Sequence, residues 1–189
     1  MSNAIKALLL CAMFIPLFSQ GGFAVELDKP LPLIDIEEAG EIALQDGKAT
    51  FVPWSSSAMD NKVTMLQVLA ASQKAADLNQ SYFDQFSERF DTNTSVSTAT
   101  IIVSNNIPKM FGGFVRKELK KNKKAHPKAI MVNDKKGLTR EQWTLPETLS
   151  VMMLVDADGV VRKYHEGKLA PEEEQNWLTK IDQLLTEAQ

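Results

Sequence analysis

The chain has 189 residues, with 21 Lys and Arg against 24 Asp and Glu, and its formal net charge is −3. It is 44% hydrophobic and 24% charged, which is typical of globular domains and excludes collagen-like, disordered and polytopic membrane classes. A net charge near zero also argues against a dedicated nucleic-acid binder. The length predicts a single domain.

The N-terminal segment, residues 1–24, has the pattern of a secretory signal peptide. Lys6 is its only charge, and the apolar stretch 7–18 is too short to cross a bilayer as a helix. Gly22 and Ala24 supply small residues at the −3 and −1 positions of a cleavage site after Ala24. We therefore predict that residues 25–189 form the mature domain and that it resides in the periplasm. The alternative is an N-terminal membrane anchor.

The only cysteine of the chain, Cys11, lies within the predicted signal peptide. Its bulky neighbour Leu10 and the apolar residues that follow argue against a lipoprotein. Cleavage would leave a mature chain without cysteine. Disulfides, thiol chemistry and thiolate metal sites are therefore not expected in the exported protein.

The segment before the first strong strand has weak signals. Residues 29–32 are extended, because a residue that precedes proline is pushed away from the helical region. Residues 51–54 form a short strand at best. A mostly apolar run at 62–70 then predicts a strand buried on both faces.

A helix is expected at 73–90 and a second buried strand at 98–103. In the helix, Phe83, Phe86 and Phe90 are spaced to form one apolar stripe.

Residues 110–124 have the pattern of a basic amphipathic helix. Its expected apolar face consists of Phe111, Phe114, Val115 and Leu119. The remaining surface is basic, and its candidate residues are Arg116, Lys117, Lys120, Lys121 and Lys124. This surface could contact anionic lipid, lipopolysaccharide or an acidic protein, or it could be a solvated helix face.

The C-terminal part is predicted to contain strands at 129–132 and 150–155. The second of these returns as a hairpin at 160–165 through the turn Asp156-Ala157-Asp158-Gly159. The last helix is expected to begin at Pro171, followed by three glutamates at the positive end of its dipole.

This order predicts an α/β fold with a mixed sheet between helices. It resembles the thioredoxin-like fold of periplasmic TlpA and peroxiredoxin-type proteins, with an inserted basic helix. The segments TATIIVSNNIPKMFGGFVRKELKKNKK and EGKLAPEEEQNWL, with Trp143 and the Asp-Ala-Asp-Gly turn between them, are similar to the YtfJ family of periplasmic proteins. The resemblance spans residues 27–186.

Redox-active thioredoxin-like proteins carry Cys-x-x-Cys at a helix N-terminus, opposite a proline. The resemblance places the two cysteine positions on Gln73 and Ala76 and the proline position on Ser150. Pro146 would take the last place only if the strand register differed. The resemblance therefore implies neither thiol–disulfide exchange nor cysteine peroxidase activity.

The same positions define a candidate groove, which could bind a peptide or a small anion or could be filled by side chains. Its candidate residues are Ser72, Gln73, Lys74, Ala76 and Ser150. No catalytic residue is assigned.

The sequence thus predicts a binding or accessory module without redox activity, whose ligand is unknown. Two alternatives stay open: an enzyme of non-thiol chemistry that uses the groove, and a peripheral binder of anionic surfaces. Two histidines, His126 and His165, without a ligand-like spacing predict no metal, and no cofactor is expected. A partner would be a periplasmic protein or an anionic lipid or lipopolysaccharide surface. Nucleic acid is not expected, and a transcriptional-regulator label that the family has carried does not fit an exported protein.

Overall fold

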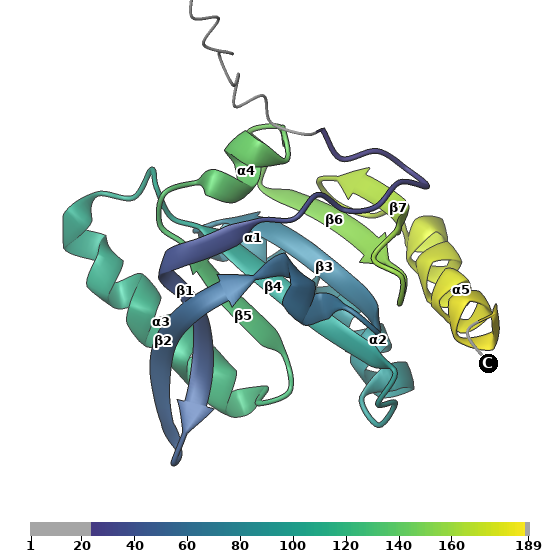
Figure 1. Ribbon diagram of the computed structural model, residues 1–189, viewed down its shortest axis with the longest axis horizontal. Helices are drawn as coiled ribbons and strands as arrows, with labels where there is room; N and C mark the ends of the chain where they lie inside the picture. Colours follow the sequence, from purple (N-terminus) through teal and green to yellow (C-terminus); the bar gives the residue numbers. More distant parts are fainter. Residues whose placement is uncertain (1–23, 188–189) are drawn as a thin grey trace, which may run out of the picture.

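The computed structural model describes residues 24–187 (Figure 1). The predicted signal peptide lies outside the described residues apart from Ala24, and so does Cys11. None of the described helices is long and apolar enough to cross a bilayer.

Seven strands form one mixed sheet in the order β2-β1-β5-β4-β3-β6-β7. The three central strands β5, β4 and β3 are parallel, and each outer strand pairs antiparallel to its neighbour. The predicted mixed sheet is confirmed. The strands are β1 (Asp35–Gln45), β2 (Lys48–Ser55), β3 (Val63–Ala70), β4 (Val96–Val103), β5 (Ile130–Asp134), β6 (Ser150–Val155) and β7 (Val161–Glu166).

Helices flank the sheet (Figure 1). The α-helices are α1 (Gln73–Asp77), α2 (Gln80–Phe90), α3 (Gly112–Ala125), α4 (Leu138–Gln142) and α5 (Pro171–Glu187). Two short 3₁₀ helices are η1 (Ser56–Met59) and η2 (Lys109–Phe111).

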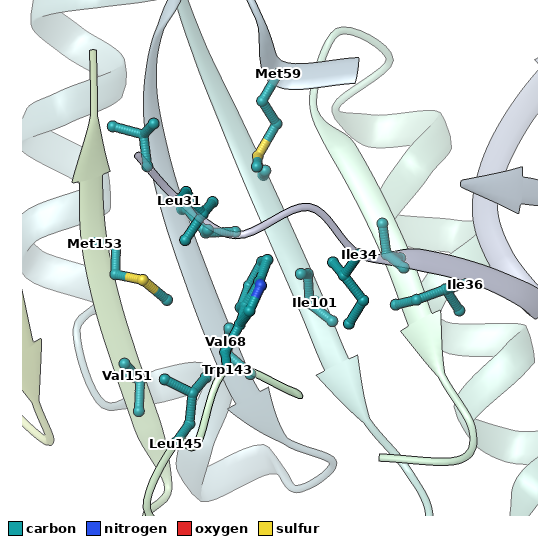
Figure 2. Packing of buried hydrophobic residues seen from close by; sticks show 14 of the residues in the cluster. Leu31, Ile34, Ile36, Met59, Val68, Ile101, Trp143, Leu145, Val151 and Met153 are labelled. Carbon is teal, nitrogen blue, oxygen red and sulfur yellow. The ribbon is translucent and has the colours of Figure 1, made fainter. Parts of the chain in front are cut away.

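One face of the sheet is covered by the chain before β1 and by the loop after α4. Successive residues of a strand point to opposite faces, and Leu66, Ile101 and Met153 point to this one. Trp143 is fully buried on them, and its Nε1 donates to the carbonyl of Pro32 at 2.8 Å. Figure 2 shows this indole at the centre of the cluster. Trp143 therefore fixes the N-terminal segment across the sheet.

The opposite face carries two separate apolar clusters. Helices α2 and α5 cover β3 and β6, with Trp177, Tyr82 and Phe86 buried against Met65 and other strand residues. Helix α3 covers β1, β2 and β5 through a smaller cluster that contains Leu119, Ile42 and Met131. Between the two clusters, Gln67 Nε2 donates to Thr100 Oγ1 at 3.0 Å, so a half-buried polar pair lies where they meet.

The hairpin of β1 and β2 is much longer than the weak sequence signals indicated. Its register shifts between Ile36 and Glu41, which is a β-bulge. Gly40 lies in the bulge with a φ of +64°, and a Cβ there would meet the carbonyl oxygen of Val52 at 2.2 Å. The bulge hides the alternation of apolar and polar residues by which a strand is recognised.

The predicted helix over 73–90 is broken into α1 and α2. The break lies at Asn79, whose buried side chain donates to the carbonyl of Gly167 at 3.0 Å and accepts from the N–H of Leu169 at 2.9 Å. These two hydrogen bonds, between residues far apart in the sequence, anchor the loop before α5. The buried stripe of α2 includes Tyr82 beside Phe86 and Phe90.

The expected apolar face of the basic helix is only partly correct. Leu119 is buried and Val115 is half-buried, but Phe111 and Phe114 are exposed. The third buried position is taken by Lys123, whose Nζ donates to the carbonyl of Ala129 at 2.6 Å.

Candidate functional site

The first turn of α1 follows the carboxyl end of β3. Ser72 is the N-cap residue, and its Oγ accepts a hydrogen bond from the N–H of Ala75 at 3.2 Å. Gln73 is the first residue of α1, and its Nε2 donates to Oδ1 of Asp77 at 2.7 Å. The structure brings four of the predicted groove residues together on the surface, namely Ser72, Gln73, Lys74 and Ala76.

Ser150, the fifth predicted groove residue, is separated from solvent. It begins β6 opposite Leu69, and it is fully buried. Its carbonyl accepts from the N–H of Gly167 at 2.8 Å, while its Oγ has no hydrogen-bond partner among the described residues. Every peptide bond of residues 24–187 is trans, and Pro146 lies in the preceding loop.

A small cleft lies at the carboxyl ends of β3 and β4, next to the start of α1. This is the edge at which parallel strands offer ligand sites. The cleft encloses about 170 Å³. Its lining residues are Ala70, Ala71, Val103, Asn105, Asn106, Ile107, Arg140 and Glu147. We call it the β3–β4 cleft.

Arg140 of α4 supplies the cleft's positive charge. Its side chain is only 8% exposed, and Nη1 donates to Oε2 of Glu147 at 2.8 Å. Nη2 donates to the carbonyl of Thr148, but Nε has no partner among the described residues. Burial of a guanidinium is costly unless its donors are satisfied. Glu147 is 73% exposed, so the partner of this buried cation can exchange with a ligand.

The position of Arg140 is set by Asp134 at the end of β5. The buried carboxylate of Asp134 accepts from the N–H groups of Gly137, Leu138 and Thr139 at 2.7 to 3.0 Å. These bonds satisfy the free donors at the start of α4. The buried carboxylate of Asp134 therefore caps the N-terminus of α4 and holds this helix at the end of β5.

Asn105, which also lines the cleft, packs against the residue that precedes α4. Gly137 has a φ of +78°, and a Cβ there would lie 2.5 Å from Nδ2 of Asn105. The amide thus packs directly on the glycine backbone. Asn105 and Asn106 are both exposed and can donate to or accept from a bound group.

Sequence reasoning did not identify Arg140, Asn105 or Asn106 as a cluster. Residues 134–137 and 105–106 have the composition of turns, and the short helix α4 was not expected. The signal that could have indicated α4 is the spacing of Asp134, Gly137 and Arg140, each three residues after the one before. Only the sheet order brings the two loops together.

The basic surface candidates lie on α3, and none of them lines the β3–β4 cleft. Arg116, Lys117, Lys121 and Lys124 are exposed and Lys120 is half-buried. The Nζ of Lys120 lies 5.5 Å from the ring centroid of Phe51, a cation–π contact.

The remaining polar candidates serve the fold. The turn carboxylate of Asp156 accepts from the N–H groups of Asp158 and Val160 and from Nε of Arg162. His165 Nε2 contacts the carbonyl of Lys168 at 3.0 Å, and His126 ends α3. Residues 24–187 contain no group of three or more His, Cys, Asp or Glu placed to hold a metal ion.

Comparison with known proteins identifies the same fold and a family. The thiol-disulfide oxidoreductase from Bacteroides fragilis is a structural neighbour with a TM-score of 0.55 and 15% sequence identity, covering 81% of this chain and 99% of that one. At this identity the likeness shows the thioredoxin-like fold alone.

Two relatives match most of the chain. The protein YtfJ of Escherichia coli K12 is 28% identical over 180 residues, which cover 95% of this chain and 97% of that protein. A Haemophilus influenzae protein is 29% identical over 170 residues, which cover 89% of this chain and 92% of that protein. The family model described as "Bacterial protein of unknown function (YtfJ_HI0045)" matches residues 25–184. The chain therefore belongs to the YtfJ family.

Proposed function

We propose that this protein is an exported thioredoxin-like module that binds a partner without thiol chemistry. The observation that supports the proposal is the first turn of α1, which contains Gln73 and Ala76, the two residues on which the resemblance places the cysteine positions of redox-active proteins. Cys11, the only cysteine, lies in the segment that we propose is removed on export. No thiolate then remains to attack a disulfide.

The proposed binding site is the β3–β4 cleft. Asn105, Asn106 and Arg140 offer hydrogen-bond donors there, and the exposed Glu147 can yield its place to an incoming carboxylate. The volume of about 170 Å³ suits one side chain of an extended segment better than a cofactor. The ligand class is accordingly a protein segment that presents an acidic side chain.

The redox part is tested by insulin reduction with dithiothreitol as the electron donor. We expect no turnover above the uncatalysed rate. Turnover by the purified protein would overturn the proposal. Export is tested on protein expressed as the full chain and recovered from a periplasmic extract, for which N-terminal sequencing should begin at Val25.

The binding part is tested by photocrosslinking in cells. A benzoylphenylalanine at Asn106, on the rim of the cleft, should capture a discrete partner. The matched control is the same residue at Gln142, which is exposed on α4 outside the cleft lining. Arg140→Met should abolish the adduct while Glu147→Gln retains it. Equal capture at both positions, or capture that survives Arg140→Met in a folded variant, would contradict the cleft as the site.

A further inference from the structure

Three large apolar side chains project from the start of α3 into solvent. Met110 is 81% exposed, Phe111 54% and Phe114 69%. They lie within five residues of each other, across η2 and the first turn of α3. Clustered exposure of this kind marks a contact surface, whereas single exposed apolar residues need no explanation. We call these three residues the apolar tip.

Phe114 of the apolar tip lies on the side of α3 that faces away from the sheet. Val115, Leu119 and Lys123, spaced by four, contact the sheet side. Phe114 and the lysines three and seven residues later, Lys117 and Lys121, lie on the opposite side of the helix. The outer face therefore runs from bulky apolar groups at its N-terminal end to cations along its length.

The cations of this outer face are largely free of acidic partners. Among the five basic surface residues, and within residues 24–187, the only ion pair joins Lys121 to Glu118, at 3.2 Å on the exposed surface. Exposed pairs of this kind contribute little. The excess positive charge is thus available to an anionic surface.

We propose that the apolar tip and the lysines of α3 dock the protein on an anionic lipid bilayer. Phe111, Phe114 and Met110 would enter the interface between headgroups and acyl chains, and Lys117, Lys121 and Lys124 would contact headgroup phosphates. The arrangement favours lipid over an acidic protein. Flexible cations spread along a helix suit a diffuse planar charge, and the bulky tip protrudes where a protein partner would need a matching pocket.

Docking in this way would bring the β3–β4 cleft close to the membrane. Asn105, Asn106 and Ile107 line the cleft, and the chain leads from them directly into η2 and the tip. The proposal stands without the cleft having a ligand, since it depends only on the outer face of α3.

The test is cosedimentation of the protein, expressed as the full chain and recovered from a periplasmic extract, with vesicles of phosphatidylcholine that contain phosphatidylglycerol. We expect binding that weakens as salt rises. Phe111→Ser/Phe114→Ser should weaken this binding by at least about tenfold, because transfer of each phenyl ring from water into the bilayer interface contributes to the binding free energy. Lys117→Glu/Lys121→Glu should weaken it by at least about tenfold as well, since each cation near the surface contributes about fivefold.

Matched controls change the same chemistry elsewhere on the surface. Leu33→Ser removes a side chain that is 73% exposed before β1, and Lys62→Glu/Lys168→Glu makes the same change in net charge far from α3. Both should bind as the unmodified protein does. Equal losses in variants and controls would overturn the proposal, and so would binding that depends on the lysines but not on the phenylalanines.

A spectroscopic reporter separates insertion from simple charge attraction. The native tryptophans Trp54, Trp143 and Trp177 are buried, so Phe114→Trp adds one exposed indole. Its emission should shift to the blue on anionic vesicles and stay unchanged on pure phosphatidylcholine. Leu33→Trp is the control and should not shift. An unshifted Phe114→Trp on bound protein would overturn insertion of the tip.

Discussion

Helices cover both halves of one face of the sheet (Figure 1), but α5 and α3 differ in how many apolar side chains they bury. Over β3 and β6, α5 buries Trp177, Leu178, Ile181 and Leu184, and its cluster includes aromatic residues of α2. Over β1, β2 and β5, α3 fully buries only Leu119 and the stem of Lys123.

The polar contacts follow the same division. Glu174 of α5 is buried, and its carboxylate accepts from Ser81 Oγ at 3.2 Å and Gln85 Nε2 at 2.7 Å, which joins α5 to α2. Burial of Tyr82, aided by the negative charge of Glu174, raises the pKa of this tyrosine far above its ordinary value, so its hydroxyl stays neutral and donates to Met65 Sδ. At the start of α3, by contrast, Met110, Phe111 and Phe114 are left in solvent. Burial on one half and exposure on the other indicate that α5 stabilises the fold, while the outer face of α3 is free for contact.

The largest effect should follow truncation on the α5 half. Trp177 is 1% exposed, and its ring lies 6.3 Å from that of Tyr82 in an edge-to-face arrangement. Trp177→Ala should lower the free energy of unfolding by about 3–5 kcal/mol, because it leaves a large cavity. Urea denaturation followed by circular dichroism measures this. A loss below about 1 kcal/mol would show that the cluster can collapse onto the site.

An intermediate effect is expected on the α3 half. Leu119→Ala should cost about 2 kcal/mol, at the lower end for buried leucines, because the surrounding cluster is small. Phe114→Ala, five residues earlier on the same helix, should change the stability by less than about 0.5 kcal/mol. Equal losses in the two variants, measured by the same denaturation, would show that Phe114 contributes to folding after all.

The smallest effect concerns the rim of the sheet, where Glu38 pairs with Lys135 and Lys136. The hydrogen bond and charge of Lys135, aided by Lys136, lower the pKa of Glu38 below its ordinary value of 4.5. Its contribution to stability is therefore present above the unfolded pKa and is lost as the pH falls through the lower folded pKa.

Glu38→Gln should accordingly lower the Tm slightly at about pH 7, and this difference should vanish as the pH falls through the lowered pKa of Glu38. The pair is exposed, so added salt should reduce even the small difference near neutrality. A difference that persists in acid would have to arise from packing and not from charge.

Much of the sheet was predictable because its central strands carry their own pattern. The apolar runs at 62–70 and 150–155 correspond to β3 and β6, and the start of α5 at Pro171 follows from the residues around it. The bulged β1 was missed, since Gly40 and its charged neighbours interrupt the alternation. The break before α2 was missed because Asn79 forms hydrogen bonds with Gly167 and Leu169, which lie about ninety residues away in the sequence.

The candidate site was likewise only partly predictable from the sequence. The absence of cysteine at Gln73 and Ala76 is visible in the sequence, whereas the burial of Ser150 and the cluster around Arg140 are not. Arg140 enters the β3–β4 cleft only because Asp134 organises α4 at the end of a strand beside β4.

From the sequence it was possible to predict the central strands, the helix that begins at Pro171, the family, and the lack of a cysteine after position 11. These depend on local pattern and residue identity. The tertiary structure alone decided which apolar residues of α3 are buried and which loops form the cleft. A helix buries only the side chains on the face that packs on its support, and α3 packs on the sheet with the face of Val115, Leu119 and Lys123, which leaves Phe114 on the outer side.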